Sequence, residues 1–181
     1  MVFSVGFFRQ RAALAAAASE GAARVTREAL RPVYYQDYGV PDTFEGRSRL
    51  VTVMTALACA RIARIGGPDA ARLADRLNAR ILDSFDAAFR EKGVGDASIA
   101  RKVRKLAEGH SGIGRALMGP LAGGADGPDA EALTDVMLRN GVCKPGHEAQ
   151  LVSHLMALHR ALAGQPDAEI LAGLFACGRT D

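Results

Sequence analysis

Residues 69–89 read DAARLADRLNARILDSFDAAF, and this stretch decides the fold class. Its apolar side chains recur three or four positions apart: Leu73, Leu77, Ile81, Phe85 and Ala88, with Leu82 and Phe89 beside them. The spacing predicts an amphipathic α-helix that buries one face, and Gly93 stands where such a helix ends. A helix of this kind needs partners to cover its apolar stripe, so the rest of the chain has to supply them.

Similar helical patterns occupy most of the remaining chain, and signals for β-strands are nearly absent. Helices are predicted over residues 9–30, 42–65, 69–92, 97–108, 129–140 and 148–163, with a short one from 167. An aspartate stands at the expected N-cap position of four of them: Asp42, Asp69, Asp129 and Asp167. Residues 109–128 are rich in glycine and proline and are predicted to form a loop.

Length and composition predict one folded domain. The chain has 181 residues, of which 49% are hydrophobic and 24% charged, so disorder along its whole length is excluded. We therefore expect an all-α fold, a single compact helical bundle of about six to seven helices. Within it, residues 1–30 form an alanine-rich N-terminal helix, for which partial disorder and a targeting role stay open, and residues 24–181 form the main helical domain.

Composition and charge also argue against a transmembrane protein, a nucleic-acid-binding protein and a disulfide-rich protein. No apolar run approaches the length of about 18 residues that a transmembrane helix needs. The net charge of +3 is too small to indicate nucleic-acid binding by itself, and with 6% aromatic residues and no Trp the chain offers few side chains for base stacking. Three cysteines fit no disulfide framework and indicate a reducing compartment: Cys59, Cys143 and Cys177.

The sequence predicts neither a cofactor nor a metal site. His147, His154 and His159 lie near Cys143, but His154 and His159 are five positions apart and would point in different directions on a helix. No nucleophile elbow or Cys-His signature is present. We therefore predict a protein without enzymatic activity, although an enzyme that acts on a lipid or quinone stays open.

The densest basic run predicts a charged helix face. It comprises Arg101, Lys102, Arg104 and Lys105, with Ile99, Val103 and Leu106 directed inward. Four cations near an anionic membrane surface contribute about 4 kcal/mol, which corresponds to a dissociation constant of about 1 mM. Such a face can steer the protein to RNA, anionic lipid or an acidic partner, but stable binding needs an additional apolar contact.

All three tyrosines lie within five residues, at Tyr34, Tyr35 and Tyr38. They precede the turn at Pro41 in a segment that we expect to be a loop. Two interpretations remain open. The rings pack over the helices, or they form an exposed aromatic lip that contacts a partner.

Three segments together resemble the ubiquinol–cytochrome c chaperone family. They are Tyr35-x-x-Tyr38-Gly39-Val40-Pro41-Asp42-Thr43-x-x-Gly46-Arg47, then Phe89-Arg90-Glu91-Lys92-Gly93-Val94-Gly95-Asp96, then Arg101-Lys102-Val103-Arg104-Lys105-Leu106. The similarity extends over about residues 24–140. From the residues alone, Asp42 and Asp96 read as helix caps and the glycines as turn residues, and Arg47 is placed to pair with Glu91 or Asp96.

The resemblance implies a non-enzymatic, all-helical assembly chaperone for the cytochrome bc1 complex, which is respiratory complex III. It implies nascent cytochrome b as the client and a second assembly factor as a partner, with the ribosome and an anionic membrane surface left open. The expected location is cytoplasmic, with peripheral contact at the inner membrane left open. The residues predicted to contact partners are Tyr34, Tyr35, Tyr38, Arg47, Arg101, Lys102, Arg104 and Lys105. The alternative function is a helical module that associates with RNA or the ribosome and has no bc1 role.

Overall fold

The structure is a computed structural model that describes residues 3–91, 96–123 and 127–177, with the side chains of residues 3–7 and 96–99 left out. These residues form eight α-helices, of which six are longer than five residues. The helices are α1 (Phe3–Ala29), α2 (Pro32–Gln36), α3 (Phe44–Ile65), α4 (Gly67–Glu91), α5 (Asp96–Ala122), α6 (Ala130–Arg139), α7 (Glu148–Ala163) and α8 (Asp167–Leu171). The predicted all-α bundle is confirmed.

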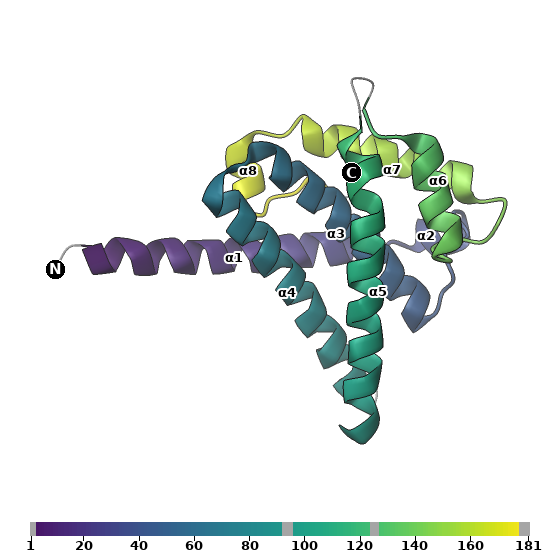
Figure 1. The fold of residues 1–181 in the computed structure, drawn as a ribbon, viewed down its shortest axis with the longest axis horizontal. Helices are drawn as coiled ribbons and strands as arrows, with labels where there is room; N and C mark the ends of the chain where they lie inside the picture. The colour runs from purple at the N-terminus through teal and green to yellow at the C-terminus, as the bar shows by residue number, and fades with distance from the viewer. Residues whose placement is uncertain (1–2, 92–95, 124–126, 178–181) are drawn as a thin grey trace.

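Helix α3 is the centre of the bundle. It packs against α1, α4, α5, α7 and α8. Figure 1 shows α4 and α5 drawing together at their lower ends, and α1 reaching past the other helices toward the N-terminus. None of the helices that the structure describes is long and apolar enough to cross a lipid bilayer.

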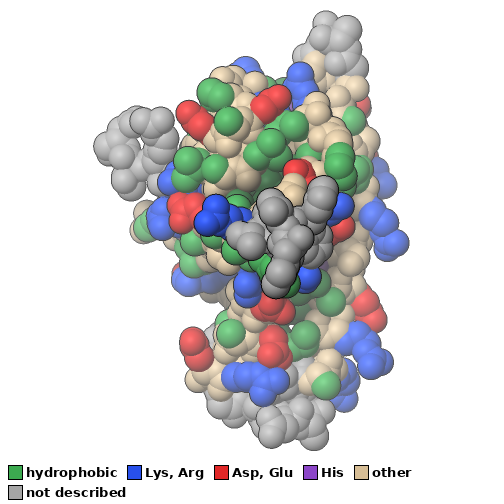
Figure 2. All heavy atoms as spheres, turned by 90° about the vertical axis from the view of Figure 1, so that its left-hand side faces the viewer, with side chains coloured by type: hydrophobic (Ala, Val, Ile, Leu, Met, Phe, Trp, Pro, Cys, Tyr) green, Lys and Arg blue, Asp and Glu red, His purple; other side chains and the backbone are tan. Residues whose placement is uncertain are grey.

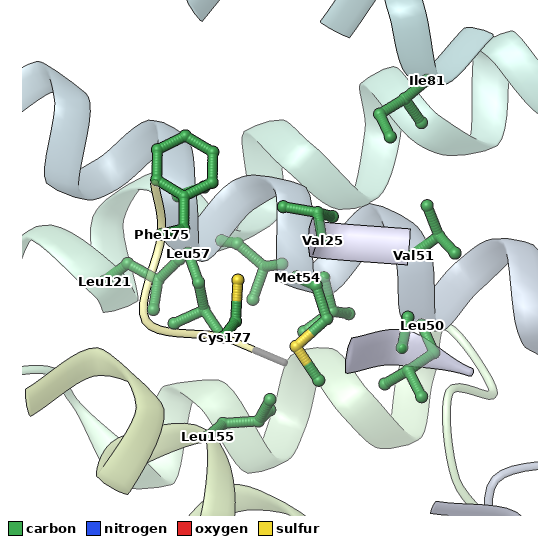
Figure 3. Packing of buried hydrophobic residues seen from close by; sticks show 14 of the residues in the cluster. Val25, Leu50, Val51, Met54, Leu57, Ile81, Leu121, Leu155, Phe175 and Cys177 are labelled. Carbon is green, nitrogen blue, oxygen red and sulfur yellow. The ribbon is translucent and has the colours of Figure 1, made fainter. Parts of the chain in front are cut away.

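The core gathers around α3 because that helix buries apolar side chains on most of its circumference. Leu50, Met54 and Leu57 of α3 lie among residues from distant parts of the chain, including Val25 of α1 and Phe175 near the C-terminus (Figure 3). A fully buried side chain of this size contributes about 1.5–3 kcal/mol. The predicted stripe of α4 is also buried: Leu73, Leu77, Ile81, Phe85 and Phe89.

Two of the four predicted N-cap residues, Asp42 and Asp69, do not cap helices α3 and α4. Thr43 caps α3, because its extended backbone lets the Thr43 hydroxyl accept a hydrogen bond from the Gly46 amide at 3.0 Å. Asp42 binds Arg47 instead. Helix α4 begins at Gly67, so Asp69 lies within its first turn, where it accepts hydrogen bonds from Gln10 and Arg72.

Of the other two predicted N-cap residues, Asp129 caps its helix and Asp167 does not. Asp129 caps α6 by accepting a hydrogen bond from the Ala132 amide at 3.0 Å, so this prediction is confirmed. The cap position of α8 is Pro166, and Asp167 is the first helical residue, paired with Arg61. The predicted bounds of α7 agree with the structure.

The predicted loop over residues 109–128 is wrong for its first part, because α5 continues to Ala122 and includes Pro120. The glycines of this stretch cost about 1 kcal/mol each relative to alanine inside a helix. Tertiary packing outweighs that cost, because Ile113, Leu117 and Leu121 are spaced four apart and are buried in the core.

The segment around the tyrosines also differs from its prediction as a loop. Pro32 ends the pattern of α1 as expected, but it then stands in the first turn of the short helix α2, where a missing amide proton costs nothing. Gly93, Val94 and Gly95 lie outside the described residues. Asp96 is the first residue of α5, and its side chain lies outside them as well, so its predicted cap role stays a prediction.

Candidate functional site

A cavity of about 540 Å³ opens between α3, α4, α5 and α6. We call it the basic pocket. Four apolar side chains form its floor: Phe85, Phe89, Leu106 and Ile113. Polar and charged groups complete the lining: Glu45, Ser48, Arg49, Thr52, Lys102, Lys105, His110, Arg139 and Asn140. Its volume lies within the range of about 300–1,000 Å³ that is usual for ligand pockets.

Aromatic contacts hold the floor of the basic pocket in place. Phe89 packs against Phe44 at the start of α3, with ring centroids 4.5 Å apart. The Phe85 and His110 rings form a T-shaped pair with their centroids 6.1 Å apart. Because Phe85 and Phe89 are buried on α4 and Ile113 is buried on α5, the floor belongs to the rigid core.

A buried hydrogen-bond chain ties three helices together beneath the pocket. His110 Nε2 lies 2.9 Å from Asn78 Oδ1, and His110 Nδ1 lies 2.9 Å from the Thr52 hydroxyl. The Asn78 amide nitrogen donates to Ala74 O, so Oδ1 faces the ring and the proton resides on Nε2. Nδ1 lies beside the Thr52 hydroxyl oxygen, whose own proton is donated to Ser48 O at 2.9 Å. Burial lowers the pKa of His110, which favours the neutral form.

We expect the free energy of unfolding to fall as pH drops below about 6.5, the ordinary pKa of histidine. The pKa of His110 is lowered in the fold, so the unfolded chain takes up the proton first and acid favours unfolding. Burial also lowers the pKa of His159, helped by Arg64 and Arg160, and this group acts in the same direction. Each histidine contributes at most about 1.4 kcal/mol per pH unit.

Urea titrations at pH 7.5 and pH 5.5 measure this pH dependence. His110→Gln keeps a polar group beneath the pocket and should remove part of the pH dependence, and His159→Gln should remove another part. An unchanged pH dependence in both variants would show that neither histidine titrates with folding.

Cationic side chains from three helices surround the mouth of the basic pocket. Lys102 and Lys105 come from α5, Arg49 from α3 and Arg139 from α6, and among the described lining residues Glu45 alone carries a carboxylate. The Lys102 ammonium lies 5.9 Å from the centre of the Phe89 ring. Arg49 donates to Gly141 O at 3.1 Å, and Arg139 is paired with Asp135.

The lysines and Arg49 are therefore available to an anionic ligand. Within the described part of the chain, none of Arg49, Lys102 and Lys105 forms an ion pair with a carboxylate. The face seen in Figure 2, toward which the N-terminus of α1 points, instead carries interspersed acidic and basic side chains. The charge at the pocket mouth therefore differs from the mixed charge of that face.

Only two of the four cations in the predicted basic run lie at the basic pocket. Lys102 and Lys105 line the basic pocket, whereas Arg101 and Arg104 are exposed on α5 and are not part of its lining. A helix places residues three apart on one side, which is why the two lysines act together.

The tyrosine prediction needs correction. Tyr34 is fully buried and donates a hydrogen bond to the buried Glu28 carboxylate at 2.5 Å, so an exposed role for it is wrong. Tyr35 and Tyr38 are partly buried; Tyr35 donates to Ala29 O at 2.6 Å. Tyr38 packs on the rings of Tyr34 and His154. The tyrosines pack over the helices and do not line the basic pocket.

Arg47 lies beside a second cavity of about 910 Å³, between α1, α3 and α4. Its Nε donates to Asp42 at 2.7 Å, and its guanidinium lies 5.2 Å from the centre of the Tyr35 ring. The hydrogen bond from Arg47 lowers the pKa of Asp42. The predicted pairing with Glu91 is therefore wrong, and the Asp96 side chain lies outside the described residues.

The glycines of the first family segment have structural roles. Gly39 has a φ of +66°, and a Cβ on it would lie 2.5 Å from the His147 ring. A Cβ on Gly46 would lie 2.0 Å from the Pro41 carbonyl oxygen. Val40 is buried in the core, so this segment organises the fold where α3 begins.

Of the residues that line the basic pocket, only Lys102 and Lys105 were predicted as site residues from the sequence. The polar and charged ones that the sequence reasoning missed include Arg49, Thr52, His110 and Arg139. They lie on three helices far apart in the chain, and no local pattern marks them. The apolar spacing through residues 106–121 was the one signal that, followed across the glycines, places His110 on the inward face of α5.

The fold and the pocket define an all-α bundle protein with a basic, apolar-floored binding pocket. Among the described residues, no three His, Cys, Asp or Glu side chains come together as a metal site. The model of the family described as ubiquinol-cytochrome C chaperone matches residues 36–177. The chain belongs to this family, and the sequence-based prediction of the family is confirmed.

A solved structure supports the same assignment. The crystal structure of the Cbp3 homolog from Brucella abortus is similar at a TM-score of 0.77 and 25% sequence identity. The match covers 100% of this chain and 97% of that chain. No curated protein matched the sequence in the corresponding comparison.

Proposed function

We propose that this protein is a non-enzymatic chaperone in the assembly of the cytochrome bc1 complex and that it binds newly made cytochrome b through the basic pocket. Its membership of the ubiquinol-cytochrome C chaperone family supports the role in assembly. The observation that carries the binding proposal is the pocket itself, an apolar floor beside cations of which Arg49, Lys102 and Lys105 form no ion pair within the described residues.

The chemistry of the pocket supports binding rather than catalysis. His110 is the histidine in its lining, and both of its ring nitrogens are hydrogen-bonded to protein groups. Neither nitrogen is free to move a proton to or from a ligand. Burial raises the pKa of the Cys59 thiol to about 11, so this cysteine, which lies outside the pocket, is a poor nucleophile at neutral pH.

Deletion of the gene is expected to lower the amount of assembled bc1 complex, and an affinity-tagged copy of the protein should recover cytochrome b from detergent extracts. Immunoblots for cytochrome b and quinol–cytochrome c reductase activity of membranes measure the two effects. Re-expression of the intact chain is the control. Unchanged bc1 levels after deletion, with no recovery of cytochrome b, would contradict the proposal.

A module that associates with RNA or the ribosome is the second candidate, and one observation favours it. Arg101 and Arg104 are exposed beside the pocket, and within the described residues neither has a carboxylate partner. Phosphate contacts release counterions, so such binding weakens steeply with salt. Sedimentation with ribosomes at rising salt tests it, and salt-insensitive association would remove it.

A further inference from the structure

We infer that the basic pocket takes an amphipathic α-helix whose apolar stripe is flanked by carboxylates. The inference deepens the proposed function: it rests on the client being a polypeptide, and it names the kind of segment that the pocket recognises. It is carried by the charges at the mouth, the apolar floor and the helical walls.

Charge complementarity indicates an acidic segment. Among the described lining residues, four side chains are cationic and one, Glu45, is a carboxylate; Arg139 is paired with Asp135 outside the lining, which leaves Arg49, Lys102 and Lys105 without an ion pair. The four cations belong to three different helices and surround the opening, which suits several carboxylates spread along a segment. Cations at the rim of an interface raise the association rate and select against like-charged partners.

The apolar floor of the basic pocket indicates that the acidic segment also carries an apolar stripe. Phe85, Phe89 and Ile113 line the pocket but are almost fully buried, so only small parts of these side chains, and no free ring faces, are exposed at its floor. Stacking of nucleic-acid bases would need exposed ring faces. Apolar side chains spaced three and four apart on a helix fill a cavity of this size as anchors.

The walls favour a helical segment over an extended one. The lining residues that the structure describes lie on helices or, for Asn140, at a helix cap, so these residues present no sheet edge to pair with a strand. A helix satisfies its own backbone hydrogen bonds, whereas an extended peptide would bury unpaired amides against Phe89 and Leu106. The docking mode is therefore a helix laid into a groove between helices.

The probe is a fluorescein-labelled peptide of about 15 residues with Leu and Phe at helical spacing and Glu on both flanks. Fluorescence anisotropy with the full chain measures its binding. The same peptide with Lys in place of Glu should bind at least about tenfold more weakly at low salt. The Glu peptide with Ser in place of its apolar stripe should show no measurable binding.

Paired variants of the chain locate the contact. Lys102→Ser with Lys105→Ser should weaken binding of the Glu peptide about tenfold, because both ammonium groups line the mouth. Arg101→Ser with Arg104→Ser removes the same charge from the same helix outside the pocket and should change the affinity less than about twofold. All four side chains are exposed, so both variants should fold.

Three results would overturn the inference. The Glu and Lys peptides bind equally, or the two paired variants weaken binding equally, or phosphatidylglycerol vesicles bind through Lys102 and Lys105 while the Glu peptide does not. The last result would show that the pocket meets a membrane surface. These outcomes are separate from failure of the proposed function, because peptide binding in solution does not depend on bc1 levels in cells.

Discussion

Replacing Arg61 by leucine is expected to lower the free energy of unfolding by about 3 kcal/mol. The Arg61 side chain is buried on α3 and reaches three acceptors at the far end of the bundle. It donates to Leu162 O at 2.9 Å, to Gln165 O at 2.8 Å and to the Asp167 carboxylate at 2.5 Å. Leucine fills similar space but leaves two backbone carbonyls without these donors.

Urea unfolding followed by circular dichroism measures the loss. Asp167→Asn is the matched control, because Asp167 is 62% exposed and its removal leaves both carbonyl contacts of Arg61 intact. We expect that variant to lose less than about 1 kcal/mol. If the two variants were equally destabilised, the ion pair rather than the carbonyl contacts would hold α3 to α7 and α8.

Gly46→Ala is expected to destabilise the protein by about 3 kcal/mol. A Cβ at position 46 would lie 2.0 Å from the Pro41 carbonyl oxygen, and backbone cannot yield as a flexible side chain does. The start of α3 would have to move away from Pro41, which would weaken the hydrogen bond between Thr43 and residue 46. Thermal and urea unfolding of the variant measure the effect.

Gly112→Ala is the control for that change. Gly112 lies inside α5, and apart from its chain neighbours and the adjoining backbone of α5 no described heavy atom comes within 4 Å of the position where its Cβ would be. Alanine should therefore stabilise the protein by about 0.5–1 kcal/mol through the lower entropy of the unfolded chain. A loss of stability at Gly112, or none at Gly46, would contradict the packing at these two positions.

The helices were predictable where the apolar spacing was regular. The apolar stripe of α4 is regular, and its residues Leu73, Leu77 and Ile81 are all buried in the core. The last residue of this helix, Glu91, lies close to the predicted end. The exact first residues were not predictable, because a cap depends on which side chain reaches a free amide. Thr43 and Asp42 both offer an oxygen, and only the backbone angles of Thr43 direct it to Gly46.

The limits of local reasoning are clearest in α5. Its glycines favour a loop by propensity, and only contact with distant helices shows that Ile113 and Leu117 repay the cost of a helix. The basic pocket has the same limit. Lys102 and Lys105 were predicted from one charged run, whereas Arg49 and Arg139 reach the pocket through the packing of α3 and α6.

The segment 37–43 joins the start of α3 to the turn that precedes α7, about 100 residues later in the chain. The Lys144 amide donates to Gly39 O at 3.0 Å, and the His147 ring lies against Gly39 and near Asp37 O. Residues Gly39 to Thr43 of the Gly-Val-Pro-Asp-Thr signature do not line the basic pocket, although Asp42 and Thr43 line the second cavity. Under the proposed function, relatives that share this signature can therefore differ in client through the side chains around the basic pocket.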